Sequence, residues 1–240
     1  MYRKGAQDKK RAKLFAKLGR ELMVAAKEGG PDRTGNPRLR SAIVTARSNN
    51  MPKDNIDRAI ARGSGDSDGT IFEEIRYEGY GPGGVALIVE ALTDNRNRTA
   101  SEVRSAFSKY NGNLAETGAV SFLFDRIGEI RYASDTSDLD AVFEAALEAG
   151  ADDVDTTEEA HEIRCQPEDL HAVASLLEDQ LGEPQSVQLV WRPQNTLSLK
   201  EGPASSLLKL LDVLEDNDDV QSVSANYEIA DDVMERLMAT

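Results

Sequence analysis

Apolar residues in the first quarter of the chain recur at helical spacing and predict three helices. The first covers residues 6–28, where leucines four residues apart share one side and no proline interrupts the run. The second is predicted to begin at Asn36-Pro37, an N-cap residue followed by proline at the first helical position. The third is predicted to begin at Pro52 and to end at Gly63. Together they predict a small bundle over residues 1–63.

The remainder of the chain alternates between strand and helix patterns. Residues 64–70 are rich in Gly, Ser and Asp and predict a flexible linker. Residues 127–192 contain a complete β-α-β-β-α-β set, whereas the stretches 71–126 and 193–240 each hold an incomplete one. Because a single β-α-β unit cannot bury both faces of its sheet, we expect the two outer stretches to form one module together. The predicted fold class is therefore α+β, with an N-terminal three-helix bundle and two ferredoxin-like (split βαβ) modules, the second inserted into the first.

Several local features of the outer module are also predicted. Strands are expected at residues 119–124 and 196–199, and a helix is expected to begin at Thr99, which has the spacing of a capping box with Glu102. The glycine-rich loop 79–84 precedes a strand, so we expect a tight hairpin and not a phosphate-binding loop at a helix N-terminus.

Charge is divided unevenly along the chain. Residues 1–62 hold 16 Lys/Arg against 6 Asp/Glu, while the rest of the chain holds 12 against 37. A basic block on an acidic protein indicates a surface for a polyanion such as nucleic acid. The alternative is that the basic block docks on the acidic half of the same protein.

The basic residues that are candidates for phosphate contacts lie mainly in the predicted bundle. In the first helix they follow a side different from that of the leucines, so the helix is expected to pack by one side and present the other. Two further arginines precede the predicted helix at Thr99; they either bind an anion or pair with carboxylates such as Glu90 or Asp94. The predicted nucleic-acid-binding residues are Lys9, Lys10, Lys13, Lys17, Arg20, Arg38, Arg40, Arg47, Lys53, Arg96 and Arg98.

Other kinds of chemistry find little support in the sequence. The single cysteine, Cys165, lies in a strand-like run and is predicted to be a buried, unreactive thiol. With His161 and His171 as the only histidines, neither a catalytic pair nor a tetrahedral metal site is indicated. The acidic runs near residues 152–155 and 215–219 lack the spacing of a calcium-binding loop and are predicted to be solvated loops. We expect no enzymatic activity, no cofactor, no metal and no small-molecule substrate, and the oligomeric state is left open.

Nothing in the sequence indicates a membrane protein. No apolar stretch approaches the roughly 20 residues that a spanning helix needs. The N-terminal residues are basic but lack the continuous apolar core of a signal peptide. We therefore predict a cytoplasmic protein that does not bind membranes.

Four long segments of the first half resemble the YebC/PmpR-type family. They are residues 3–30, 36–63, 73–99 and 101–114, with runs such as RKGAQDKKRAKLF, NNMPKDNIDRAI and YEGYGPGGVALIVEALTDNRNRT. The sequence departs from the family pattern at its start, where Met1-Tyr2 stand in place of a Gly-His-Ser type of segment. The resemblance implies a helical bundle with two ferredoxin-like modules and no enzymatic chemistry. It also implies a DNA-binding transcriptional regulator or, alternatively, a ribosome-associated translation factor that binds ribosomal RNA.

Overall fold

The computed structural model describes residues 2–65 and 71–238 and divides the chain into two compact units. Unit 1 consists of Met1–Lys17, Thr70–Asp125 and Trp191–Thr240, and unit 2 consists of Leu18–Gly69 and Arg126–Val190. Most of the predicted linker, residues 66–70, lies outside the described residues. None of the helices in the described part of the chain combines the length and apolar character needed to cross a membrane.

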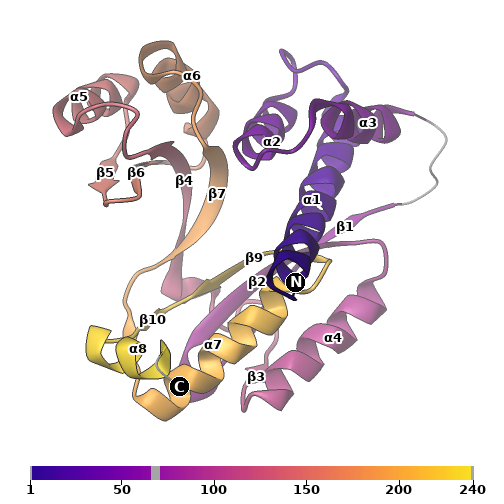
Figure 1. The fold of residues 1–240 in the computed structure, drawn as a ribbon, viewed down its shortest axis with the longest axis vertical. Coiled ribbons are helices and arrows are strands. Elements are labelled where there is room, and N and C mark those ends of the chain that lie inside the picture. Colours follow the sequence, from indigo (N-terminus) through magenta and orange to yellow (C-terminus); the bar gives the residue numbers. More distant parts are fainter. Residues whose placement is uncertain (1, 66–70, 239–240) are drawn as a thin grey trace. The chain divides into compact units, whose positions relative to one another are not determined.

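Three helices form the N-terminal region, as predicted: α1 (Tyr2–Gly29), α2 (Pro37–Ser48) and α3 (Lys53–Ser64) (Figure 1). The predicted cap of α2 is confirmed, because the Asn36 side chain accepts a hydrogen bond from the Leu39 amide at 3.0 Å. The same side chain donates to the Ala25 carbonyl at 2.7 Å and so fixes the start of α2 to the end of α1.

Helices α1, α2 and α3 pack closely around aliphatic side chains. Each contributes a buried residue: Leu22 from α1, Leu39 from α2 and Ile56 from α3. Gly63 of α3 approaches the backbone of α1 so closely that a Cβ there would lie 2.2 Å from the Met23 carbonyl oxygen. Glycine at this position therefore allows α3 to pack against α1.

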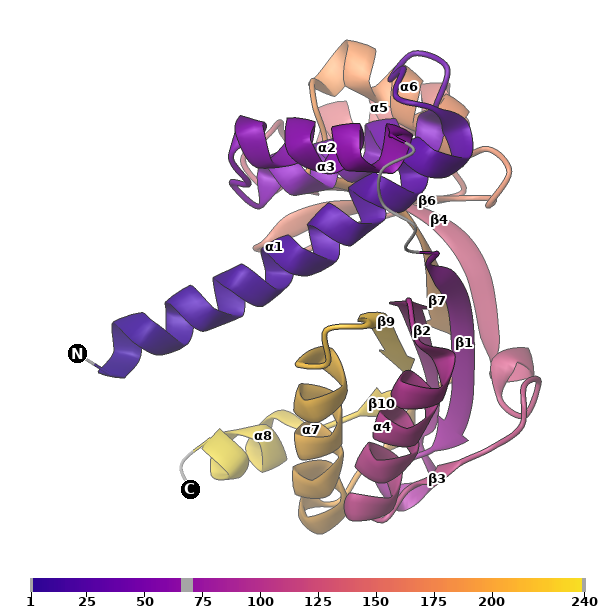
Figure 2. The same ribbon diagram turned by 90° about the vertical axis from the view of Figure 1, so that its right-hand side faces the viewer.

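Unit 1 contains a four-stranded antiparallel sheet in the order β3-β1-β2-β9, covered on one face by two helices (Figure 2). Successive side chains of the inner strand β2 point to opposite faces of the sheet. Leu87 and Val89 belong to the core formed with the helices, whereas Ala86 and Ile88 pack against Val120 and Phe124 on the other face. The elements are β1 (Glu73–Tyr80), β2 (Ala86–Thr93), α4 (Arg96–Lys109), β3 (Asn113–Leu114), α7 (Glu201–Glu215), β9 (Val220–Ala225) and α8 (Asp231–Met238).

The strand order of this sheet is ferredoxin-like, but two of its strands differ from those predicted. Residues 119–123 do not form a strand, because Ser121–Leu123 form a 3-10 turn (η2), and Phe124 is the first residue of β4. Residues 196–199 supply β8 (Leu197–Ser198), which pairs with β10 (Tyr227–Glu228) in a separate two-stranded sheet. Their places are taken by β1 and β3, and the predicted hairpin between β1 and β2 is confirmed.

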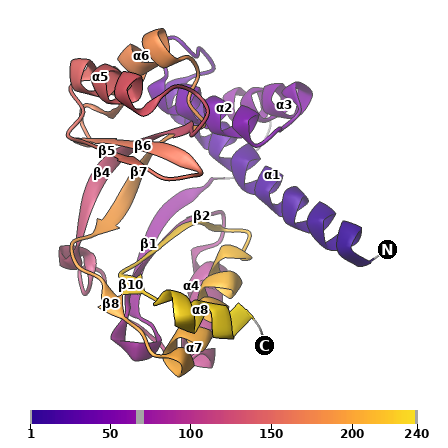
Figure 3. The same ribbon diagram turned by 60° about the vertical axis from the view of Figure 1, so that its left-hand side comes forward.

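Unit 2 contains most of a second four-stranded sheet, in the order β5-β6-β4-β7. Helices α5 and α6 lie side by side on one face of this sheet (Figure 3). Ile130, Tyr132 and Ile163 from the strands pack against Val142 and Leu177 from the helices. The elements are β4 (Phe124–Ala133), α5 (Leu139–Ala149), β5 (Asp153–Thr156), β6 (Ala160–Cys165), α6 (Leu170–Leu181) and β7 (Ser186–Pro193). This sheet lies in sequence between β3 and β9 of the first sheet, so the predicted insertion of one α+β module into the other is confirmed.

Candidate nucleic-acid interface

One side of α1 carries most of the predicted phosphate-contacting residues. Lys9, Lys13, Lys17 and Arg20 fall within about 80° around the helix axis, and Lys10 extends this arc to about 100°. Lys9 and Lys10 are exposed, whereas Lys13, Lys17 and Arg20 are half-buried. We call these five residues the α1 stripe.

Two lysines of the α1 stripe contact the C-terminal end of α7 within unit 1. Lys13 Nζ lies 2.6 Å from Asp216 Oδ2 and donates to the Asp216 carbonyl at 2.9 Å, and Lys17 donates to the Glu215 carbonyl. The last carbonyls of a helix lack partners within it, so cations are favourable there. The hydrogen bond from Lys13 lowers the pKa of Asp216, while burial lowers the pKa of Lys17 despite the nearby carboxylates.

This contact corrects the prediction that residues 215–219 form a solvated loop. Asp216 pairs with Lys13, and Asp219 is only 3% exposed. The alternative weighed from the sequence, that basic residues dock on the protein's own acidic half, therefore holds for part of the α1 stripe.

The three arginines of α2 differ in their surroundings. Arg38 is held between the Glu21 carboxylate, at 2.7 and 2.9 Å, and the Glu28 carboxylate, at 2.8 Å. A bidentate pair of this geometry fixes α2 against α1, so Arg38 serves the fold. Arg47 pairs with Glu183 at 3.1 Å, but both side chains are about half-exposed, and such a pair contributes little to stability.

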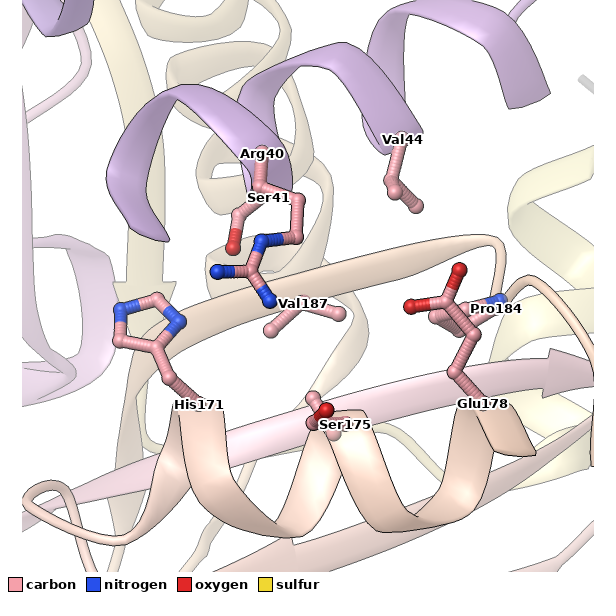
Figure 4. Close-up of a pocket in the computed structure, with 9 residues that line it drawn as sticks. Arg40, Ser41, Val44, His171, Ser175, Glu178, Pro184 and Val187 are labelled. Atoms are coloured by element: carbon pink, nitrogen blue, oxygen red, sulfur yellow. The ribbon is translucent and has the colours of Figure 1, made fainter. Parts of the chain in front are cut away.

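Arg40 lies in a small pocket between α2 and α6 of unit 2 (Figure 4). Its guanidinium points toward the imidazole of His171, and burial together with the Arg40 charge lowers the pKa of His171. Ser175 and Glu178 line the same pocket from α6. Arg40 is therefore partly enclosed, whereas Lys53, the first residue of α3, is exposed and forms no ion pair with any described residue.

The two arginines in the first turn of α4 differ in their surroundings. The Arg98 guanidinium donates to Asp219 at 2.7 Å and to Asp94 at 2.8 Å, and these bonds raise the pKa of Arg98. Arg96 is exposed and has no ion-pair partner among the described residues. The pairing alternative weighed from the sequence thus describes Arg98, with Asp219 as an additional partner.

Asp219, in the turn between α7 and β9, is a buried carboxylate that joins this turn to the start of α4, and sequence reasoning did not identify this role. Its carboxylate also accepts hydrogen bonds from Thr99 at 2.7 Å and from Thr93 at 3.1 Å. The predicted capping box is wrong, because α4 begins three residues earlier with Asn95 as its N-cap, and Thr99 lies buried inside the helix. The Thr99 hydroxyl donates to the Asp219 carboxylate from inside α4 and does not cap the start of the helix.

Groups outside the basic regions give little support for catalysis or metal binding. Cys165 is buried as predicted, and burial raises the pKa of its thiol to about 11, so the thiol stays protonated at neutral pH. Both ring nitrogens of His161 have partners, Thr156 Oγ1 at 2.9 Å and the Ser134 carbonyl at 3.2 Å. Within residues 2–65 and 71–238, no three His, Cys, Asp or Glu side chains gather as a metal site would require.

These features define a class of α+β protein in which a helical, partly cationic N-terminal region precedes two sheet modules. Residues 1–66 match the TACO1/YebC protein N-terminal domain, and residues 72–227 match the TACO1/YebC second and third domain. The chain belongs to the TACO1/YebC family.

Two relatives cover nearly the whole chain. A protein of Zymomonas mobilis named a probable transcriptional regulatory protein is 60% identical over 237 residues, which is 99% of this chain and 95% of the relative. The crystal structure of a conserved hypothetical protein from Aquifex aeolicus is similar with a TM-score of 0.86 and 48% identity, covering 92% of this chain and 91% of the other.

Proposed function

We propose that this protein is a non-enzymatic cytoplasmic regulator of gene expression that binds DNA through the α1 stripe. The observation that carries the proposal is the alignment of four lysines and one arginine on one side of a single helix, with Lys9 and Lys10 exposed. The name of the Zymomonas mobilis relative, a probable transcriptional regulatory protein, supports the same kind of role. Lys53 and the arginines Arg40 and Arg47 are proposed as further phosphate contacts.

The contacts of Lys13 and Lys17 with the end of α7 are compatible with this role. Asp216 is exposed, and exposed ion pairs contribute about 0–1 kcal/mol, so a phosphate group can replace such a partner. The acidic end of α7 then acts as a weak competitor for the α1 stripe. Arg38 and Arg98, whose carboxylate partners are part of the fold, are not among the residues that we propose to contact phosphate.

Asn49 and Asn50 are of a residue type that can read adenine edges, but both are engaged in a turn. The Asn49 side chain donates to the Thr45 carbonyl at 2.8 Å, and Asn50 has a left-handed backbone conformation with φ of 57°. Both features belong to the connection between α2 and α3. We therefore propose binding dominated by phosphate contacts, which position a protein on nucleic acid without specifying a sequence.

Measuring DNA affinity against salt concentration tests the proposal. The variant carries Lys9→Ala, Lys10→Ala and Lys13→Ala, and fluorescence anisotropy follows its binding to two unrelated duplexes. Each lost phosphate contact lowers the salt slope by about 0.9, so the slope should fall by about 2–3 for both duplexes.

A second triple variant controls for the change in net charge. It carries Lys109→Ala, Lys200→Ala and Lys209→Ala, which are exposed lysines far from α1 in the sequence. This control should leave the salt slope unchanged. If both variants lower the slope equally, or if neither does, the α1 stripe is not the contact surface.

Binding to ribosomal RNA is the second candidate function. It is favoured by the turn role of Asn49 and Asn50, which makes these two side chains poor readers of base edges, and by the exposed Arg96 at the start of α4. Co-sedimentation with ribosomes at moderate salt, compared with duplex DNA binding at the same salt, separates the two functions. If the protein sediments with ribosomes, Arg96→Ala reduces this binding, and duplex DNA is not bound, then ribosomal RNA is the target and the DNA proposal is wrong. If the protein does not sediment with ribosomes, the second candidate function is excluded.

A further inference from the structure

The outer side of α5 exposes three large apolar side chains in one row. Leu139, Phe143 and Leu147 follow one another at a spacing of four residues and are 54%, 57% and 69% exposed. Side chains at this spacing lie next to each other along a helix. We call these three residues the α5 row.

The α5 row is not needed for the core of its own module. The buried side of the helix is formed by Val142, Ala145, Ala146 and Ala149, which pack against the sheet and α6. The Asp138 side chain caps the helix by accepting from the Ala141 amide at 2.8 Å, so the row is displayed on a well-anchored helix. A contiguous apolar surface of this kind usually marks a place where another molecule binds.

The charge around the α5 row is strongly negative. Asp140, Glu144 and Glu148 lie beside it on the exposed side of α5. Residues 127–190 as a whole hold 17 Asp/Glu against two Lys/Arg. An apolar row flanked by carboxylates repels phosphate backbones and complements an apolar surface flanked by lysine or arginine.

We propose that the α5 row is a docking surface for a protein partner that presents an amphipathic helix with basic residues beside its apolar side. A second copy of this chain fits the surface poorly, because a two-fold contact between α5 helices would bring the carboxylates of Asp140, Glu144 and Glu148 close to those of the other copy. The proposal is independent of the proposed binding of DNA, which uses other residues.

The test measures binding of a labelled model helix to the full-length protein. The probe is a fluorescent peptide of about 18 leucine and lysine residues, with the leucines at helical spacing. One control peptide has glutamate in place of lysine, and another has the same composition in strictly alternating order. The helical basic peptide should bind, and both control peptides should bind much more weakly.

Two matched sets of substitutions locate the site. Leu139→Gln, Phe143→Gln and Leu147→Gln together should weaken binding at least about tenfold, because central apolar anchors carry most of the energy of such interfaces. The control set Ile71→Gln, Phe122→Gln and Met238→Gln removes exposed apolar side chains of unit 1, and it should change binding less than about twofold. Circular dichroism checks that both variants are folded, and Phe143→Gln alone serves if the triple variant is not.

A third set tests the role of charge. Asp140→Asn, Glu144→Gln and Glu148→Gln should weaken binding about fivefold at low salt and reduce its salt dependence. Affinity for duplex DNA should stay the same in the α5 row variant, so a failure here is distinct from a failure of the proposed function.

Four results would overturn the proposal: equal losses in the α5 row and control sets, equal binding of the control peptides, loss of DNA affinity in the α5 row variant, or a dimer in sedimentation that this variant dissociates. The last result would identify a second copy as the occupant.

Discussion

Substitution of Glu78 by glutamine is expected to destabilise unit 1 strongly. Glu78 lies on β1 with its side chain 0% exposed. One carboxylate oxygen accepts hydrogen bonds from the amides of Val120 at 2.9 Å and Ser121 at 3.0 Å, and the other accepts from Arg76 Nε at 3.0 Å. The buried charge thus holds the turn at residues 120–123 against the sheet.

The size of the effect follows from these three bonds. Hydrogen bonds to a charged group contribute about 1.5–3 kcal/mol each, against about 0.5–1.5 kcal/mol for neutral ones. Glutamine keeps an oxygen for the two amides but turns an NH₂ group toward Arg76, where two donors then face each other. We expect a loss of about 2–4 kcal/mol in the free energy of unfolding of unit 1.

Urea denaturation followed by tryptophan fluorescence measures this loss. Trp191, the single tryptophan, lies in the same network, since the Arg76 guanidinium sits 5.0 Å from its ring centroid and its indole nitrogen donates to Glu90 at 3.1 Å. Glu73→Gln, an exposed position on the same strand, is the matched control and should change the midpoint very little.

The pH dependence provides a second check on Glu78. Burial raises its pKa, but the amides of Val120, Gly118 and Ser121 together with Arg76 outweigh burial, and the pKa lies below its ordinary value. A carboxylate with a lowered folded-state pKa stabilises the protein above the unfolded-state pKa of about 4.3, and this stability is lost as the pH falls through the folded-state pKa. The difference between wild type and Glu78→Gln should therefore be full at pH 7 and shrink below about pH 4.

A difference that stays constant down to pH 3, or a Glu78→Gln variant as stable as Glu73→Gln, would refute this reasoning.

Three further outcomes are expected. Asp216→Asn should strengthen binding of duplex DNA in anisotropy measurements by about two- to fivefold, because Lys13 loses a competing carboxylate. Arg98→Ala should lower the free energy of unfolding in urea by about 2 kcal/mol, because it leaves the buried Asp219 carboxylate without its cation. Burial and a neighbouring guanidinium lower the pKa of His171, so thermal stability should fall as the pH drops below about 6.5, and His171→Asn should weaken that dependence.

The elements governed by local pattern could be predicted from the sequence. The cap at Asn36 and the hairpin between β1 and β2 agree with the structure, because capping and turn residues act within a few positions of one another. The α1 stripe could be recognised for the same reason.

The features set by distant partners could not be predicted. Residues 119–124 have the composition of a strand, but the amides of Val120 and Ser121 bind Glu78, more than 40 positions away, and the chain turns there. Thr99 and Glu102 have the spacing of a capping box, but the Thr99 hydroxyl donates a hydrogen bond to Asp219, which is 120 positions away in the sequence. The partners of Lys13 and Lys17 are about 200 positions distant, so spacing could identify the lysines but not the carbonyls that they contact.

The inserted α+β module begins and ends at neighbouring positions of the fold. The connecting strands β4 and β7 are neighbours in their sheet, and the Gln194 amide donates to the Leu123 carbonyl at 3.0 Å where both strands leave unit 1. The inserted stretch therefore departs and returns at almost the same point. We expect that a chain without residues 127–190, with the two strands joined by a short turn, would keep the order β3-β1-β2-β9 of the first sheet.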